Sequence, residues 1–317
     1  MERLPGLKIL GKIKVLEIEN KKPKEKLRSQ EQILSAVNEG MLHSVPLVNE
    51  RAASFEDAPN PILDEEGRIN MNVYFDVYGK KVVDFDKNNA YQQKRGFYQT
   101  YTREVQEKYG TTDENQIIET IKKKERMRDG NISEEALFLL MNKIGGDRYL
   151  AVRSCEHDDF IEGTDLLLID TVTGKTICAF DETVEGVNSR LDRKIQRAKD
   201  KLLKGRGMQV KYGMSFLQSN DKKSRMKLGK IKNIPPLFLS VNKKTLEELL
   251  QNMDFRIDSD IGESEEKIVS EIISSIDSQI SDLETASQGN VSYDSVKSFM
   301  DHLKLNLEYV SEIKKAG

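Results

Sequence analysis

Between residues 133 and 253 the spacing of apolar and polar residues predicts a series of helices and strands. Apolar residues recur first at helical spacing, then in three short runs that turn residues separate, and then at helical spacing again. A further apolar run and an amphipathic segment complete this stretch. The pattern predicts a helix, three strands, a helix, a strand and a closing helix, over residues 134–141, 149–154, 165–170, 176–181, 188–203, 236–241 and 244–253.

Glycine marks two of the predicted boundaries. Gly145-Gly146 ends the first helix, because glycine accepts the left-handed conformation in which helices often finish. Thr173-Gly174-Lys175 separates the second strand from the third, and glycine supplies the positive φ that a tight reversal needs. We therefore expect a hairpin turn between these two strands.

Acidic residues stand at the ends of the second and third predicted strands. Asp165 opens the second strand and Asp181 ends the third. This order of elements, with acids at these positions, resembles the PD-(D/E)XK nuclease superfamily, which has the restriction-endonuclease-like fold. Glu134 or Glu135 matches the acidic residue that many members carry on the first helix. The resemblance covers residues 130–253 and implies an α/β fold with a mixed central sheet flanked by helices.

The sequence departs from the family motif at one position. The motif places a lysine two residues after the acid of the third strand, since alternate side chains of a strand share a face. Thr183 stands two residues after Asp181, and choosing Glu182 as the acid would place Val184 there. Either the cationic role has moved to another element or the domain no longer cleaves.

The helix expected after the third strand carries a basic stripe. Arg190, Lys194, Arg197 and Lys201 share one helical face, separate from an apolar stripe further round the helix. We expect this face to bind nucleic-acid phosphates together with residues 204–232, which are expected to form a basic loop. Lys194 is the first candidate for the moved cation, and Arg190 or Arg197 follows. The alternative interpretation is a solvated basic surface.

The resemblance also implies a metal site. Phosphodiester hydrolysis in this superfamily needs Mg²⁺ or Mn²⁺, and hard oxygen ligands suit both ions. We expect Asp165 and Asp181 to bind one ion, and Glu135 to bind a second ion or to hold a ligating water. Catalysis would then depend on these three acids and Lys194. Both kinds of acid also have interpretations without a metal. An Asp at a strand end can be a turn residue, and a Glu at a helix start is favoured by the helix dipole alone.

Other candidate chemistry is sparse. Asp158-Asp159 with His157 is expected in a loop before Asp165 and could supply a further ligand. The sequence contains neither a Walker-type phosphate-binding loop nor a Gly-x-Gly-x-x-Gly fingerprint, and it has no Cys/His cluster with zinc spacing. Cys155 and Cys178 are expected to be reduced and packed as small apolar groups.

The flanking regions are assigned by pattern alone. Residues 1–129 are expected to form an α+β region of unknown role, residues 130–253 the nuclease-like core, and residues 254–317 a helical hairpin. The hairpin has apolar residues at spacings of three and four, so it either packs onto its own domain or binds a partner or second copy. The N-terminal expectations are a strand at 8–18, a helix at 29–41, a loop at 43–70, a hairpin from strands 73–78 and 81–85, and a helix at 114–128.

Composition fits these assignments. The 317 residues are 37% hydrophobic and 32% charged, with a net charge of −3 that conceals a basic segment at 190–232 and an acidic one at 254–284. No apolar run approaches the roughly 20 residues of a membrane span, and no secretory signal opens the chain. We therefore expect a cytoplasmic protein without membrane association.

Three functions are consistent with the sequence. The first is a metal-dependent phosphodiesterase acting on DNA, such as an Mg²⁺-dependent endonuclease of phage, mobile-element or defence type. The second is an inactive nuclease-fold subunit that binds DNA or assembles with partners, which the threonine at position 183 favours. The third is a structural or scaffold protein in which the helical hairpin drives assembly.

Overall fold

The computed structural model describes residues 27–90, 129–185, 188–218 and 224–316. The strand expected at 8–18 and the helix expected at 114–128 lie outside these ranges. Within them the chain is mixed α/β, with a four-stranded mixed sheet and a separate two-stranded ribbon. No helix in these ranges combines the length and the apolar character that crossing a bilayer requires.

The central sheet has the strand order β1-β2-β3-β6. The first three strands are antiparallel neighbours, and β6 runs parallel to β3 on the other side. Leu166 lies opposite Phe180, and Phe180 lies beside Leu237, so the apolar runs are in register across the sheet. The strands are β1 (Tyr149–Arg153), β2 (Leu166–Asp170), β3 (Lys175–Glu185) and β6 (Pro236–Asn242). The four strands expected within residues 130–253 are confirmed.

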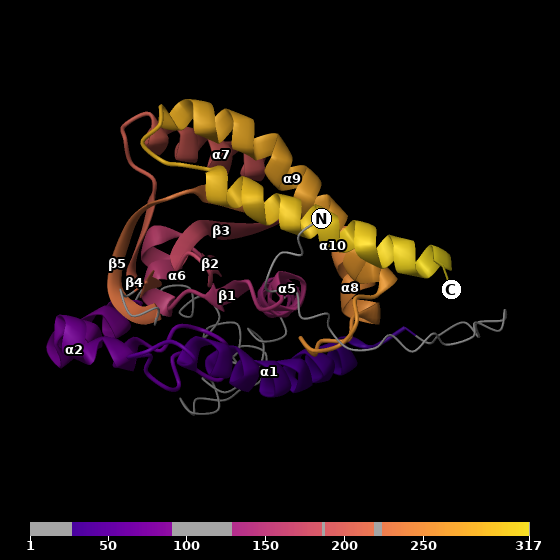
Figure 1. Cartoon of the computed structure of the whole chain (residues 1–317), viewed down its shortest axis with the longest axis horizontal. Helices are drawn as coiled ribbons and strands as arrows, with labels where there is room; N and C mark the ends of the chain where they lie inside the picture. Colours follow the sequence, from indigo (N-terminus) through magenta and orange to yellow (C-terminus); the bar gives the residue numbers. More distant parts are fainter. Residues whose placement is uncertain (1–26, 91–128, 186–187, 219–223, 317) are drawn as a thin grey trace, which may run out of the picture.

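Helices cover both faces of this sheet. Figure 1 shows α7, α9 and α10 together on one side and α1 on the other, with α5 between α1 and α10. The longer helices of the core and the hairpin are α5 (Asp129–Gly145), α7 (Asn188–Leu202), α8 (Lys243–Asn252), α9 (Glu263–Ser287) and α10 (Asp294–Ala316). The helices expected within residues 130–317 are confirmed, and α5 is longer than the pattern predicted.

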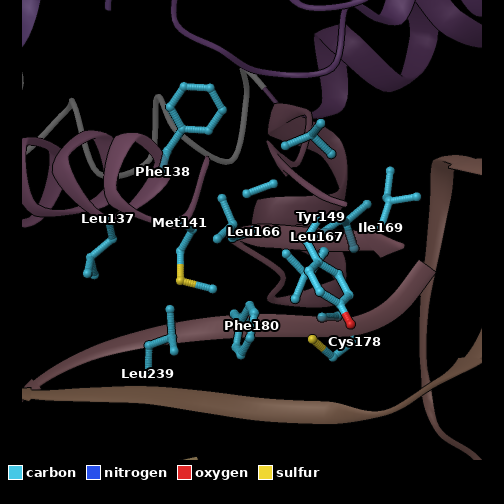
Figure 2. Close-up of a cluster of buried hydrophobic side chains, with 14 of the residues drawn as sticks. Leu137, Phe138, Met141, Tyr149, Leu166, Leu167, Ile169, Cys178, Phe180 and Leu239 are labelled. Carbon is cyan, nitrogen blue, oxygen red and sulfur yellow. The ribbon is translucent and has the colours of Figure 1, made fainter. Parts of the chain in front are cut away.

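One hydrophobic core joins these layers. Figure 2 shows Phe138 and Met141 of α5, Leu167 of β2, Phe180 of β3 and Leu239 of β6 in one cluster. The same core continues into α1 and into the α9–α10 hairpin. Both cysteines, Cys155 and Cys178, are buried and not bonded to each other, as expected.

The apolar seam of the C-terminal hairpin faces its own chain. Ile276 and Leu283 of α9 and Leu303 of α10 are buried, and α9 packs against β6, α7 and α8. Lys143 of α5 and Glu265 of α9 form a buried ion pair (Nζ–Oε1 2.6 Å). The seam is therefore used for packing within the chain, and binding of a partner by the remaining faces of the hairpin stays a prediction.

The prediction of a loop at 43–70 is wrong for residues 43–53, which are helical. Helix α1 (Gln30–Ala53) starts at a capping box formed by Ser29 and Gln32, and it continues through Pro46. Proline normally ends a helix because it lacks the N–H that the helix needs. Here burial of Val45 and Val48 in the shared core keeps the helix intact.

The hairpin expected at 70–85 is also wrong, because this stretch is helical. It comprises η1 (Met71–Tyr74), α2 (Phe75–Tyr78) and a helical segment over 80–90. Tyr74 and Tyr78 are four residues apart, so on a helix they share a face. Their hydroxyls donate to the carbonyls of Gly213 and Lys211, and these contacts with a distant strand override the local β-like pattern.

The basic loop expected at 204–232 is mostly a β-ribbon. Strands β4 (Met208–Gln218) and β5 (Ser224–Ile234) pair antiparallel and form the curved ribbon at the left of Figure 1. On β4 the side chains of Val210, Tyr212, Met214 and Phe216, at every second position, are buried. The frequent lysines concealed this period of two, which is the signal of a half-buried strand.

Asn142 is a buried polar residue that joins α5 to the edge strand β1. Its Nδ2 donates to the carbonyl of Ala151 (2.9 Å), and its Oδ1 accepts from the N–H of Ala151 (3.1 Å). We expect Asn142→Leu to lower the free energy of unfolding by about 2–4 kcal/mol, because both backbone groups would be buried without partners. Urea unfolding followed by circular dichroism measures this.

The control is Asn252→Leu, the same change at an exposed position near the end of α8. It should change the free energy of unfolding by less than about 0.5 kcal/mol. A loss at Asn142 as small as the loss at Asn252 would contradict this account of the edge strand.

Candidate active site

Acidic side chains from four elements meet at one end of the central sheet. The antiparallel register pairs Leu166 with Phe180, so Asp165, just before β2, lies next to Asp181 on β3. The N–H of Asp165 donates to the carbonyl of Phe180 (2.9 Å), which continues the ladder to this point. The acids that share this region are Glu134, Glu135, Asp159, Asp165, Asp181 and Glu182.

A hydrogen bond fixes Asp165 against β3. Its Oδ2 accepts from the backbone N–H of Glu182 at 2.6 Å. Asp165 is partly exposed, so one end of the carboxylate is held by the sheet while the residue remains accessible to solvent. This contact joins the side chain of Asp165, just before β2, to the backbone of β3.

Lys194 reaches the same place from α7. Its Nζ lies 2.5 Å from Oδ1 of Asp181 and donates to the carbonyl of Glu182 at 2.9 Å. The apolar side of α7, including Ala198 and Leu202, is buried in the core and fixes the rotation of the helix. The ammonium therefore lies among the strand-end acids, although it comes from a different element.

Arg153 holds the acids of α5. It is the last residue of β1 and is almost fully buried. One terminal nitrogen lies 2.9 Å from Oε2 of Glu134, and the other lies 3.5 Å from Oε1 of Glu135. The second nitrogen also donates to the carbonyl of Glu66 (2.9 Å), so Arg153 joins the site to the N-terminal region.

Arg68 enters the site from that N-terminal region. The N–H of Ile69 donates to the carbonyl of Arg153, and the N–H of Arg153 donates to the carbonyl of Gly67, so this segment extends the edge of β1. The guanidinium then lies 3.0 Å from Asp159 and 3.5 Å from Glu134. Burial alone would lower the pKa of Arg68, but the surrounding carboxylates outweigh burial and raise it.

Two of the acids have strongly perturbed protonation. Burial, followed by repulsion from Asp159, Glu134 and Asp181, raises the pKa of Asp165 well above its usual range. Burial, followed by repulsion from Glu134 and Asp165, does the same to the pKa of Glu182. The negative charge of the cluster thus exceeds what Arg68, Arg153 and Lys194 offset, and a further cation would stabilise the ionised forms.

The structure brings together four of the residues predicted from the sequence: Asp165, Asp181, Glu135 and Lys194. Two other predicted phosphate-binding residues, Arg197 and Lys201, are exposed further along α7. The side chains of Arg190 and Thr183 lie outside the described part of the structure.

Sequence reasoning missed the arginines. Arg68 is distant in sequence and lies in a stretch expected to be a loop, so no local signal pointed to it. Arg153 is the last but one residue of the strand predicted at 149–154, and its position near that strand end was an available signal. Glu134 was considered only as a substitute for Glu135, yet both contact Arg153.

The loop expected around Asp158-Asp159 is a short helix, α6 (Glu156–Glu162). Its two aspartates have different roles. Asp159 faces Arg68, whereas Asp158 is fully buried and accepts from the N–H groups of Lys211 and Tyr212 (2.8 and 2.9 Å). Asp158 therefore anchors the β4–β5 ribbon and is not positioned as a ligand.

The oxygen atoms at the strand ends suit a hard divalent cation. Among the described residues no group of three or more His, Cys, Asp or Glu side chains is arranged to hold a metal ion. Mg²⁺ is commonly bound through one or two carboxylates, with waters and substrate phosphates completing its shell. Asp165 and Asp181 fit this smaller ligand set.

Comparisons of the chain with protein-family models, with curated proteins and with solved structures found no match.

The raised pKa values predict that stability falls as pH rises. Above the ordinary carboxyl pKa the native protein still binds protons that the unfolded chain has released, so the free energy of unfolding decreases with pH. Asp165→Asn removes one such group, and its amide oxygen can still accept from the N–H of Glu182. The variant should be more stable than the wild type near neutral pH, by on the order of 1 kcal/mol, with no difference below about pH 4.

Urea unfolding in EDTA at several pH values measures this difference. Asp282→Asn is a suitable control, because Asp282 is an exposed acid that pairs with Lys199 on the surface. Parallel pH profiles for the wild type and Asp165→Asn would contradict the electrostatic account of the site.

Proposed function

We propose that the chain is a metal-dependent phosphodiesterase that acts on DNA, with a core of the restriction-endonuclease type. The order α5-β1-β2-β3-α7-β6 supports this, together with Asp165 before the second strand and Asp181 and Glu182 on the third. The mixed sheet, with β6 parallel to β3, agrees with the fold that the resemblance implies. Insertion of α6 and of the β4–β5 ribbon leaves this order intact.

The position of Lys194 is the observation that carries the proposal. The family motif needs a cation beside the acid of the third strand, and position 183 is threonine. Lys194 supplies an ammonium 2.5 Å from the carboxylate of Asp181, from the helix that follows the strand. A cation at the required place, supplied by another element, would compensate for the missing motif lysine.

In this proposal Asp165 and Asp181 hold Mg²⁺ or Mn²⁺. The bound ion would lower the pKa of a water and neutralise charge that develops on the phosphate. Hydrolysis joins the water oxygen to phosphorus, breaks one P–O ester bond, and transfers one proton from water to the leaving oxygen. Lys194 would orient the water through its N–H groups and stabilise negative charge in the transition state.

The remaining charged residues position this centre. Arg153 and Arg68 hold Glu134, Glu135 and Asp159 around it, and they also connect α5 and α6 to the edge of the sheet. The energetic cost of ionising Asp165 and Glu182 is offset when a divalent cation binds. A site that needs a metal to complete its charge balance is consistent with a metal-dependent enzyme.

A non-catalytic DNA-binding or assembly subunit is the second candidate. The observation that favours it is that both strand-end aspartates already have protein partners: Asp165 accepts from the N–H of Glu182, and Asp181 pairs with Lys194. In such a subunit the ion pair would stabilise the fold and no metal would be needed.

Cleavage assays distinguish the two candidates. We expect the wild type to cut plasmid or linear DNA with Mg²⁺ or Mn²⁺, and Lys194→Met to lower the rate by about 10²–10⁴-fold, the range for loss of a group acting in proton transfer or charge stabilisation. The control is Lys199→Met on the same helix, because Lys199 pairs with Asp282 on the surface. It should cut at the wild-type rate.

Absence of cleavage by the wild type on plasmid, linear and single-stranded DNA with either ion would favour the non-catalytic subunit. Equal rates for Lys194→Met and Lys199→Met would show that Lys194 has no part in the reaction.

Metal binding can be tested without activity. Mn²⁺ should raise the thermal unfolding temperature of the wild type, because an ion that binds only the native state adds about 2.7 kcal/mol at a hundred times its Kd. Asp165→Asn and Asp181→Asn should lose most of this increase, while Asp282→Asn should keep it. An increase of equal size in all four proteins would place the ion elsewhere.

A further inference from the structure

A pocket with a volume of about 490 Å³ lies at the base of the β4–β5 ribbon. Its walls come from the end of α6, the end of α7, the turn after α7, and the paired start of β4 and end of β5. The cationic side chains that line it are Lys201, Arg206, Lys230 and Lys232. The acid in the lining, Glu162, accepts a hydrogen bond from Gln209 (2.9 Å).

The four cations of this pocket differ from other cations of the same region in their pairing with carboxylates. In the part of the chain that the structure describes, no carboxylate pairs with any of them. On neighbouring surfaces Lys199 is paired with Asp282, and Lys211 is paired with Asp86. The pocket therefore has an excess of positive charge, which an anionic ligand would neutralise.

The backbone gives the pocket a defined shape. A Cβ at Gly207 would lie 2.8 Å from the backbone of Asn233, so only glycine permits the turn to approach β5 this closely. Asn233 and Gly205 both have positive φ (57° and 70°). The N–H of Arg206 donates to the carbonyl of Lys201 (3.0 Å) and folds the turn back onto α7. The backbone therefore places the four cationic residues around a concave surface and not on a flat one.

The pocket and the candidate active site are connected by α7. Lys194 lies at the strand-end acids and Lys201 lines the pocket. They are two helical turns apart on one face, which corresponds to about 10 Å along the axis. Successive nucleotides of a DNA strand rise about 3.4 Å, so this separation corresponds to about three nucleotides.

We propose that this pocket binds a backbone phosphate of nucleic acid, about three nucleotides from the phosphate that lies at Lys194. The inference rests on the proposed function and specifies how the substrate strand would be held. Lysine and arginine side chains donate charge-assisted hydrogen bonds to phosphate oxygens, and a pocket of this size accommodates a phosphodiester with its flanking sugars. Inorganic phosphate offers the same group without the strand, and the experiment separates the two ligands.

The test uses the double variant Lys230→Glu/Lys232→Glu in the full chain. Its affinity for a short fluorescent DNA duplex is measured by anisotropy in EDTA over a range of salt concentrations. Affinity should fall by about ten-fold or more, and the slope of log affinity against log salt should decrease by about 2, because two phosphate contacts are lost. The control Lys243→Glu/Lys244→Glu makes the same charge change on the exposed surface of α8 and should bind like the wild type.

Lys201→Gln is a milder variant that serves if the double variant does not fold. This variant should lower the slope of log affinity against log salt by about 1, because one phosphate contact is lost. Wild-type affinity in a folded pocket variant, or an equal loss in the α8 control, would overturn the proposal. Displacement of DNA by inorganic phosphate beyond the effect of chloride at equal ionic strength would overturn the strand-binding role in favour of free phosphate.

The proposed function can fail separately from this inference. If the wild type binds DNA but leaves it uncut when Mg²⁺ is added, the phosphodiesterase proposal is wrong. A weaker affinity of the pocket variant in the same experiment would still support the pocket as a phosphate-binding site. If the wild type cuts DNA and the pocket variant cuts with unchanged KM, the pocket inference is wrong and the phosphodiesterase proposal stands.

Discussion

Repulsion among acidic side chains at one end of the sheet is the constraint around which this molecule is arranged. Asp165 and Glu182 have raised pKa values because they are partly buried beside other carboxylates. Three cations counter the repulsion, and each comes from a different element: Arg153 from β1, Lys194 from α7 and Arg68 from the N-terminal region. A protein that only needed stability would gain by replacing such a cluster with apolar residues. Such a cluster is expected where the charges have a function.

The N-terminal region takes part in the same arrangement. The segment that carries Arg68 extends the edge of β1, and Asn49 of α1 holds the preceding residues by accepting from the N–H groups of Ile62 and Leu63. Tyr74 docks on the β4–β5 ribbon, which Asp158 of α6 also anchors. This region, whose role the sequence left unknown, therefore contributes one cation to the site and supports the ribbon that forms the basic pocket.

The sequence predicted the central elements well because their signals are local. Apolar runs, the turn at Gly174 and the amphipathic pattern of α7 each depend on nearby residues. The expectation that Asp165, Asp181 and Lys194 lie close to one another came from the resemblance built on those elements. Contacts between distant segments were not predictable in this way. The helices at 71–90 depend on hydrogen bonds from tyrosines to β4, and the pairing that positions Arg68 depends on the free edge of β1. The β4–β5 ribbon was missed because lysines interrupt its apolar alternation.

The central claim is that the strand-end acids hold a divalent cation with Lys194 beside them. The most direct measurement is the anomalous diffraction of crystals soaked with Mn²⁺. The account predicts an anomalous peak between Asp165 and Asp181, with the ammonium of Lys194 within reach of the ion's waters. Strong Mn²⁺ peaks elsewhere, with none between these two aspartates and the Asp181–Lys194 pair unchanged, would contradict it.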